Sequence, residues 1–141
     1  MASSTKINQS SAFAPAVCFH NKLFHMVFVA NNGSRDLLHA VSQDGIHWTR
    51  KNNVGQSTKA APPIASLGQL RVVFVANNDT NTLLTCFYDE AHDSWSKNNP
   101  IVGQSSKTTP ALALPQPANR LLMYFVANND SDDLLVLDIS E

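Results

Sequence analysis

Charged residues are scarce in this sequence: lysine, arginine, aspartate and glutamate make up 15% of its 141 residues, and the formal net charge is -1. Such a chain offers no basic field to a nucleic-acid backbone and no polybasic patch to a membrane surface. It also lacks a run of about 20 apolar residues that could span a bilayer, and residues 1–9 contain no apolar signal-peptide core. We therefore expect no nucleic-acid partner, no membrane insertion, and a cytoplasmic or non-classically released protein.

Cysteine and histidine are too few and too scattered to indicate a metal or redox site. Cys18 and Cys86 are interpreted as free thiols buried in strands, with a disulfide or redox pair as the alternative. The five histidines show no zinc-ligand spacing with cysteine or carboxylate support. We therefore expect neither a metal nor a cofactor. No segment combines a 3.6-residue apolar period with helix caps, so no helix is predicted.

An internal repeat dominates the sequence instead. The stretch Phe-Val-Ala-Asn-Asn starts at residues 28, 74 and 125, so its copies are 46 and 51 residues apart. An apolar run precedes each copy, and a small polar turn and a Leu-Leu pair follow it, which predicts strand, turn, strand. Gln-Ser-Ser or Gln-Ser-Thr starts at residues 9, 56 and 104, and prolines follow at 15, 62 and 110. The repeat is therefore wider than its most obvious motif.

Each complete repeat predicts four short strands and an all-β fold. In the first copy the expected strands cover residues 14–19, 23–30, 37–42 and about 48–54. Proline in the first strand removes a ladder hydrogen bond, so that strand should lie at a sheet edge. Repeated four-stranded units of about 40–50 residues are typical of β-propeller blades. Phe28, Phe74 and Phe125 should then be buried alike.

The blades are expected at residues 9–55, 56–103 and 104–141, and the third lacks its outer strand. Counting back 47 residues from 48–54 gives 1–7, so residues 1–8 are predicted to complete the last blade of a second chain. Propellers contain about 4–8 blades, so three blades cannot close a ring alone. Two chains joined head to tail would form a six-bladed homodimer.

Tracing one blade places the Gln-Ser loops and the Asn-Asn turns at the same end of the ring. Amides, hydroxyls and ammonium groups there offer donors and acceptors that suit sugar hydroxyls. The alternative is structural, because Asn-Asn before Gly or Asp favours hairpin turns and Gln-Ser can tie neighbouring blades together. The candidate ligand-binding residues of this face are Asn31, Asn32, Gln56, Ser57, Lys59, Asn77, Asn78, Gln104, Ser105, Lys107, Asn128 and Asn129.

The opposite end carries the sequence Ser-Gln-Asp-Gly-Ile-His-Trp at residues 42–48. This turn resembles the Asp-box of sialidases and related propellers, although its glycine directly follows Asp44. The second copy decays to Asp-Glu-Ala-His-Asp-Ser-Trp at 89–95. In the Asp-box family the turn is structural, so we interpret Asp44 and Trp48 as supporting the fold. Stacking of Trp48 and Trp95 on a sugar ring is the alternative.

The four-stranded repeats also resemble the propeller lectins, both the six-bladed fucose-binding kind and the seven-bladed bacterial kind. In the six-bladed lectins an Arg on strand two, a Glu on strand three and a Trp bind sugar between blades. Arg71 matches that Arg position, whereas its equivalents are His25 and Leu122, and strand three carries His39 or Thr85 in place of Glu. The resemblance implies a multivalent lectin with shallow inter-blade sites, glycan partners and no catalysis.

Two other functions stay open. A sialidase-like glycoside hydrolase fragment is one, although its arginines should form a cluster and Arg35, Arg50, Arg71 and Arg120 do not recur at matching positions. No repeated pair of carboxylates indicates glycoside hydrolysis. The other is a propeller scaffold for protein–protein interaction, since one fold supports many functions.

Overall fold

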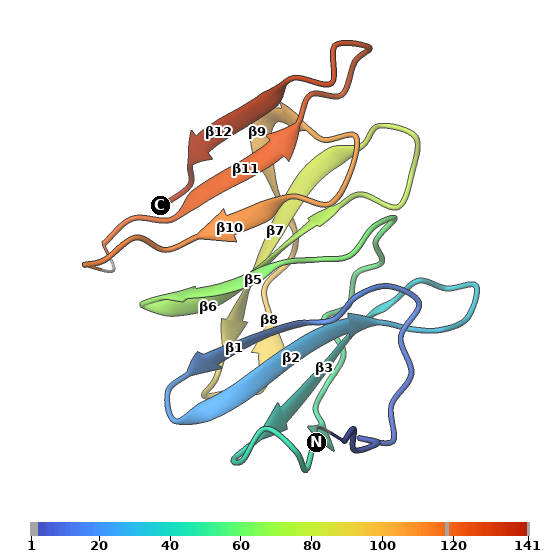
Figure 1. Ribbon diagram of the computed structural model, residues 1–141, viewed down its shortest axis with the longest axis vertical. Coiled ribbons are helices and arrows are strands. Elements are labelled where there is room, and N and C mark those ends of the chain that lie inside the picture. Colours follow the sequence, from blue (N-terminus) through green and yellow to red (C-terminus); the bar gives the residue numbers. More distant parts are fainter. Residues whose placement is uncertain (1–2, 118, 141) are drawn as a thin grey trace.

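The chain is all-β and forms three antiparallel sheets that resemble propeller blades. The structure is a computed structural model that describes residues 3–117 and 119–140. Figure 1 shows the three sheets lying one above another in chain order, with blade one at the bottom and blade three at the top. No helix within the described part of the chain is long and apolar enough to cross a membrane.

The strands follow one another across each blade in chain order. Blade one contains β1 (Ala16–His20), β2 (Leu23–Val29), β3 (Leu37–Ser42) and β4 (Thr49–Arg50). Blade two contains β5 (Ile64–Leu67), β6 (Gln69–Val75), β7 (Thr82–Asp89) and β8 (Ser94–Trp95), and β9 (Asn99–Ser105) also pairs with β7. Blade three contains β10 (Ala111–Ala113), β11 (Leu122–Val126) and β12 (Leu134–Asp138).

The inner and middle strands agree with the sequence prediction, except that Pro15, Pro62 and Pro110 precede β1, β5 and β10 instead of lying within them. These three strands lie at sheet edges as expected. The outer strand of blade one differs, because β4 ends at Arg50 instead of continuing to Val54. The chain beyond it still bonds to β3, since Lys51 N donates to His39 O at 2.9 Å and Val54 N donates to Leu37 O at 3.1 Å. An irregular ladder has therefore replaced a regular strand.

Two of the three apolar clusters lie between blades, and the third, Met26, Phe28 and Ala40, lies on the outer side of blade one. Phe28, Phe74 and Phe125 are 1%, 0% and 3% exposed, which confirms that the repeated phenylalanines are buried alike. Alternation along β2 and β6 sends neighbouring side chains to opposite faces of a blade. One core cluster joins blades one and two through Val27, Val29, Leu37, Val54, Ile64, Val72, Phe74 and Cys86. A second joins blades two and three through Ala65, Val73, Val75, Leu83, Leu121, Met123, Phe125 and Ile139.

Both cysteines are free and lie in strands, as the sequence predicts. Cys86 is buried in β7 and Cys18 is half-buried in β1. Burial raises the pKa of each thiol to about 11. Because the thiolate is the reactive form of cysteine, both side chains serve as small apolar groups in the fold.

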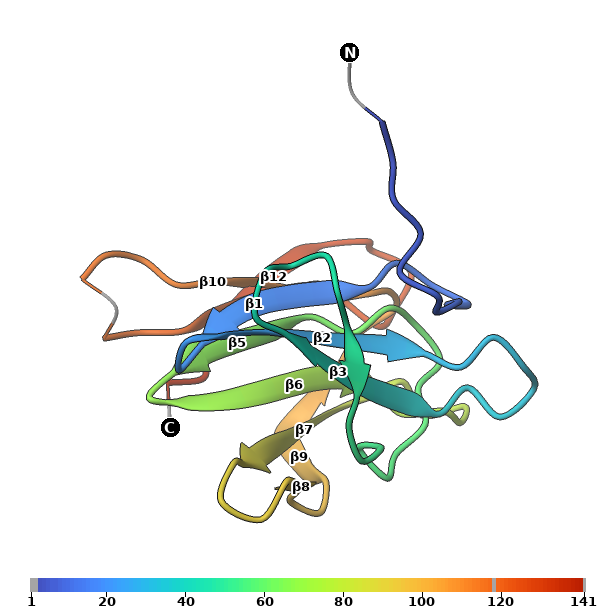
Figure 2. The ribbon, with the colours of Figure 1, turned by 90° about the horizontal axis from the view of Figure 1, so that it is seen from below.

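The N-terminal segment, residues 3–8, pairs with no described strand of its own chain. Residues 3–8 form no described strand; Figure 2 shows the start of this segment extending away from the sheets, while Ile7, near its end, packs on blade one. Residues 1–2 of the predicted outer strand lie outside the described residues. The assignment of this segment to the blade of a second chain stays a prediction.

Candidate functional site

The Asn-Asn turns share one hydrogen-bond pattern. Backbone bonds of 2.8 Å close each turn, from Ala30 N to Asp36 O, Ala76 N to Thr82 O and Ala127 N to Asp133 O. The second asparagine of each pair accepts a backbone N–H two residues later. These bonds measure 2.8 Å at Asn32, 2.9 Å at Asn78 and 2.9 Å at Asn129. The side-chain oxygens of these three residues therefore stabilise the turns.

The first asparagine of each turn, Asn31, Asn77 and Asn128, is exposed. Asn77 Nδ2 donates to Ser57 Oγ at 3.4 Å, so the turn of blade two meets the loop that enters the same blade. Asn128 Oδ1 accepts from Asn81 Nδ2 at 2.9 Å, which links the turns of blades two and three. The predicted sharing of one face by turns and Gln-Ser loops is confirmed by these contacts.

The Gln-Ser loops connect neighbouring blades. Leu37 N donates to Gln56 O at 2.8 Å in blade one, while Lys59 N donates to Val75 O at 3.2 Å in blade two. Lys59 Nζ reaches Asn81 Oδ1 at 2.7 Å, and Lys107 Nζ pairs with Asp132. In the next loop, Gln104 and Ser105 are half-buried within β9. This geometry favours the structural interpretation of the loops, and sugar binding by them stays a prediction.

The Asp-box-like turn is held by its aspartate. Asp44 Oδ1 accepts the backbone N–H groups of Ile46 and His47 at 2.8 Å each, and the His47 ring lies 2.7 Å from Asp44 Oδ2. The backbone and ring N–H groups of His47 lower the pKa of the Asp44 carboxyl. Trp48 Nε1 donates to Gly45 O at 3.1 Å. The contacts agree with the structural role predicted for Asp44 and Trp48.

The two tryptophans occupy equivalent places on different blades. Trp48 packs against Met26, Phe28 and Ala40 on the outer side of blade one. Trp95 packs into the core between blades one and two, and its Nε1–H lies 3.3 Å from His39 Nδ1. Both side chains are therefore only half-exposed. Stacking of the two tryptophans on a sugar ring stays a prediction.

A chain of aromatic donors and acceptors lies between blades one and two. If Trp95 donates to His39 Nδ1, then His39 Nε2 carries the proton and donates to His25 Nδ1, 3.0 Å away. The proton of His25 then lies on Nε2, which is buried without a partner among the described residues. Both imidazoles stack with their ring centroids 5.2 Å apart, and the Tyr88 ring contacts each. In blade two, Arg71 and Thr85 stand at the places of the two histidines.

Burial keeps both histidines neutral. It lowers the pKa of His39 to about 3, and burial together with the nearby His20 lowers the pKa of His25. In the unfolded chain both imidazoles return to an ordinary value near 6.5. The folded state therefore binds fewer protons than the unfolded state below that pH, and its stability falls as the solution is acidified.

We expect His39 alone to lower the free energy of unfolding by about 2 kcal/mol between pH 7 and pH 5, with His25 adding to the fall in the same direction. In blade three, Leu122 and Val136 stand at the places of His25 and His39. The double variant His25→Leu/His39→Val introduces these two residue types in blade one and should reduce the dependence of the free energy of unfolding on pH. Urea denaturation at each pH measures it. His92→Ala, at an exposed ring, is the control and should keep the slope; an unchanged slope in the double variant would refute the assignment.

A cleft of about 580 Å³ opens between blades two and three. Its walls come from β6 and β7 on one side, β9 along one edge and the end of β12 on the other. The lining residues are Arg71, Thr85, Phe87, Asn99, Pro100, Ile101, Val102, Leu137, Asp138 and Ile139. The cleft thus combines a guanidinium, an amide and a carboxylate with an aromatic ring and aliphatic surface.

Arg71 is fixed in the wall of this cleft. The residue is 4% exposed, its Nε donates to Thr85 Oγ1 at 3.2 Å and its Nη1 donates to Ile139 O at 2.5 Å. The guanidinium carbon lies 4.7 Å from the centre of the Phe87 ring. Burial lowers the pKa of Arg71, but the ordinary value is so high that the group stays charged at neutral pH. A rigid, charged donor therefore stands over an aromatic face.

The cleft differs from the interface of blades one and two in what covers it. In the interface of blades one and two, Trp95 covers His39, whose equivalent Thr85 lines the cleft. Blade three contains no described strand after β12. The sequence pointed to Arg71 through the lectin resemblance, but not to Phe87, Asn99 and Asp138. These three residues come together because β9 crosses from blade two toward blade three, and the repeat pattern does not predict the path of β9.

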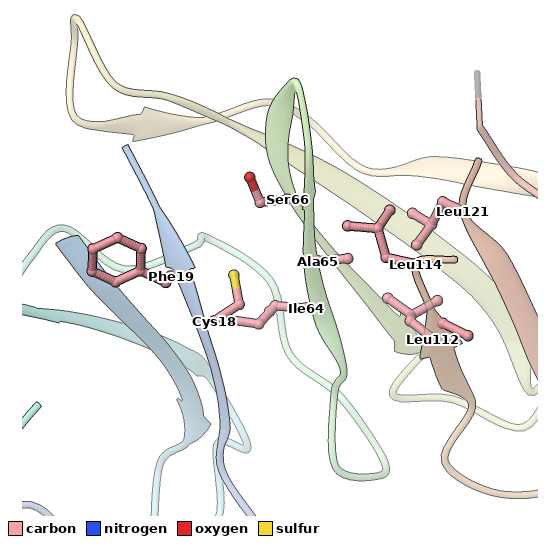
Figure 3. A pocket seen from close by; sticks show the side chains of 9 residues that line it. Cys18, Phe19, Ile64, Ala65, Ser66, Leu112, Leu114 and Leu121 are labelled. Atoms are coloured by element: carbon pink, nitrogen blue, oxygen red, sulfur yellow. The ribbon is translucent and has the colours of Figure 1, made fainter. Parts of the chain in front are cut away.

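A smaller pocket of about 220 Å³ lies against the inner strands β1, β5 and β10. Figure 3 shows Cys18 and Ile64 between β1 and β5, and Leu112, Leu114 and Leu121 together on the side of blade three. Ser66 and Cys18 supply the polar side-chain atoms of the lining, and no carboxylate lines it. Within the described residues, no group of three or more His, Cys, Asp or Glu side chains could hold a metal ion.

Comparison with solved structures shows the fold. No protein-family model matches the chain, and no curated protein matches it. An exo-β-1,3-galactanase from Phanerochaete chrysosporium matches with a TM-score of 0.67 and 11% identity, over 93% of this chain and 36% of that one. A thermostable family-43 glycoside hydrolase gives 0.63 and 12%, over 95% and 51%. The Bacillus subtilis arabinanase Arb43A gives 0.59 and 15%, over 84% and 48%.

The matched proteins are five-bladed β-propeller glycoside hydrolases of family 43. At these identities the likeness shows the propeller fold alone, and the chain spans about a third to half of their length. The blade architecture expected from the repeats is thereby supported. The sequence pattern resembles propeller lectins, whereas the structural matches are hydrolases, so the propeller fold is what the two have in common.

Proposed function

We propose that this chain binds carbohydrate in the cleft between blades two and three and does not cleave it. The observation that carries the proposal is the Arg71 guanidinium held over the Phe87 ring at 4.7 Å in an open cleft. The fold relates the chain to carbohydrate-active propellers, and the proposal extends that relation to a lectin-like activity.

The cleft matches the chemistry of a sugar. A pyranose ring has an apolar face that packs on aromatic and aliphatic side chains, and hydroxyls that need donors and acceptors. The two bonds of Arg71 account for two of its five N–H donors, so the guanidinium retains donors for ligand hydroxyls. Asn99 and Asp138 are exposed at the rim and supply an amide and acceptor oxygens.

The carboxylates favour binding over cleavage. Glycoside hydrolases commonly use two carboxyl groups, about 5–10 Å apart, as acid and as nucleophile or base. Asp138 is the single carboxylate among the residues that line the cleft, and the inner-strand pocket has none. A fragment of a family-43-type hydrolase is the second candidate function, and the structural matches favour it.

Blade repetition does not make the sites equal. The position of Arg71 is held by His25 in blade one and Leu122 in blade three. Each chain would therefore contain one sugar-binding cleft with an arginine, and a six-bladed ring of two chains would contain two. Single shallow sites of this kind bind with Kd values of about micromolar to millimolar, and two sites in one ring would raise avidity on a glycan-coated surface.

A glycan array that includes β-1,3-galacto-oligosaccharides and arabino-oligosaccharides tests the proposal. We expect retention of a subset of glycans, with binding weakened by Asn99→Ala and by Asp138→Asn at the exposed rim of the cleft. Asn78→Ala and Lys59→Ala change the opposite face and should leave binding intact. If only Asn78→Ala and Lys59→Ala lose glycan retention, the sugar site lies at the Asn-Asn turns instead of in the cleft.

The same preparation separates the alternatives. Release of fluorophore from aryl arabinosides or galactosides would overturn the non-catalytic proposal and support the hydrolase. A blank array together with no hydrolysis would contradict both carbohydrate functions and leave the protein–protein scaffold.

A further inference from the structure

Blade three exposes apolar side chains where the other blades bury them. Tyr124, Leu134 and Val136 are 44%, 80% and 57% exposed. The strand registers pair Tyr124 with Val136 just as they pair Val27 with His39 and Val73 with Thr85. These equivalents in blades one and two are at most 5% exposed, because the next blade covers them. The outer face of blade three therefore has the character of an inter-blade surface.

Blade one has a complementary free face on its opposite side. Val17 and Phe19 project from β1 and are 48% and 57% exposed. Val17 pairs with Met26, as Ile64 pairs with Val72 in blade two. Ile64 is 9% exposed because blade one covers it. Of the eight large hydrophobic residues that are exposed in the described chain, five lie on these two free faces.

The N-terminal segment has the features of an outer strand. Ile7 packs on the Met26, Phe28 and Ala40 cluster of blade one. Val54, at the end of blade one, packs in the same way on the Val72, Phe74 and Cys86 face of blade two, and Ile101 on the face of blade three.

The backbone of this segment repeats the pattern as well. A residue with left-handed backbone follows each of these apolar side chains. Asn8 directly follows Ile7 with φ of 61°, Gly55 directly follows Val54 with φ of 86°, and Gly103 lies two residues after Ile101 with φ of 72°. Glycine and asparagine are the residues that tolerate this region best. Residues 3–8 thus lie where the outer strand of a preceding blade would lie, although the described chain contains no such blade.

A strand edge is available for this segment. In blade two, β7 pairs with β6 on one side and with β8 and β9 on the other. In blade three, β12 pairs with β11 on one side, and no described strand lies along its other side. An open edge next to an exposed apolar face is a surface that another strand can extend.

We propose that a second copy of this chain covers the free face of blade three and places its N-terminal segment along β12. The pairing of β9 with β7 fixes the register, since Asn99, Pro100 and Ser105 lie opposite Thr85, Leu84 and Thr82. Transferred by equivalence, Thr5, Lys6 and Ser10 of the second copy lie opposite Val136, Leu135 and Asp133. Tyr124 and Leu134 then pack against Val17 and Phe19, and the reciprocal contact closes a ring of six blades.

Sedimentation equilibrium of the full chain and of Leu134→Glu tests this interface without any sugar, so it is independent of the proposed function. We expect the mass of two chains for the unchanged protein and of one chain for Leu134→Glu, whose side chain is 80% exposed within its own chain and should not disturb folding. Ile46→Glu, at another exposed apolar residue, is the control and should keep the mass of two chains. A single-chain mass for the unchanged protein, a larger assembly, or a Leu134→Glu variant that keeps two chains would overturn the proposal.

A cysteine pair tests the register. Thr5→Cys/Val136→Cys should form a covalent two-chain species under mild oxidation, because directly opposed cross-strand residues lie within disulfide reach. Thr5→Cys/Leu122→Cys places the second thiol on the neighbouring strand β11 and is the matched control. Equal cross-linking in both variants, or none in the first, would contradict the assigned register.

Discussion

Truncation of Phe74 to alanine is expected to lower the free energy of unfolding by about 3–5 kcal/mol, the usual range for a well-packed aromatic side chain. The ring is 0% exposed and belongs to the core between blades one and two. Its removal leaves a cavity in the cluster that also contains Val27 and Ile64, and the close packing of the two blades limits collapse. Urea denaturation at one fixed protein concentration measures the loss.

The matched control is Ile46→Ala. Ile46 is 49% exposed in the Asp-box-like turn, so its truncation should change the free energy of unfolding by less than about 0.5 kcal/mol. A loss below about 1 kcal/mol for Phe74→Ala would mean that Phe74 does not carry the packing between blades one and two.

Replacement of Arg71 by lysine is expected to weaken sugar binding by about 10- to 100-fold, which corresponds to about 1.4–2.8 kcal/mol. Lysine retains the positive charge but loses the planar set of donors that bonds Thr85 and Ile139 and stacks on Phe87. The ligand would therefore lose both oriented donors and a fixed cleft wall. Titration calorimetry with a glycan retained on the array measures the change.

Arg50→Lys is the matched control for that experiment. The Arg50 guanidinium also lies over a phenylalanine, 5.7 Å from the Phe28 ring centre, but on an exposed position outside the cleft. We expect its affinity for the same glycan to be unchanged. Equal affinities for Arg71→Lys and the unchanged protein, with the fold intact by circular dichroism, would remove Arg71 from the site.

The fold was largely predictable because its information is local and repeated. Three copies of an apolar run, a polar turn and Leu-Leu specify two strands each, and Pro15, Pro62 and Pro110 indicate edge strands. The outer strands were less predictable. Between Trp95 and Gly103 the second copy has one residue more than lies between Trp48 and Gly55, and the hydrogen bonds of β4 and β9 differ accordingly.

The candidate site was predictable only in part. Asn-Asn and Gln-Ser-Lys repeat clearly, yet Asn78 and Lys59 direct their side chains to the turns beside them. Arg71 does not repeat, and its setting depends on Phe87 from β7 and Asp138 from β12, which are 51 positions apart in the sequence numbering, 87 to 138. The repeat predicts the features that all blades have in common, whereas the residues of this cleft differ from blade to blade.

Sugar is proposed to bind between blades two and three. Amide chemical shifts recorded while the best-retained glycan is titrated into the labelled protein test it most directly. We predict saturable shifts at Thr85, Phe87 and Leu137, with the amide of Asn78 on the opposite face unmoved. Shifts confined to the Asn-Asn turns, with the amides of the cleft unmoved at saturation, would contradict the account.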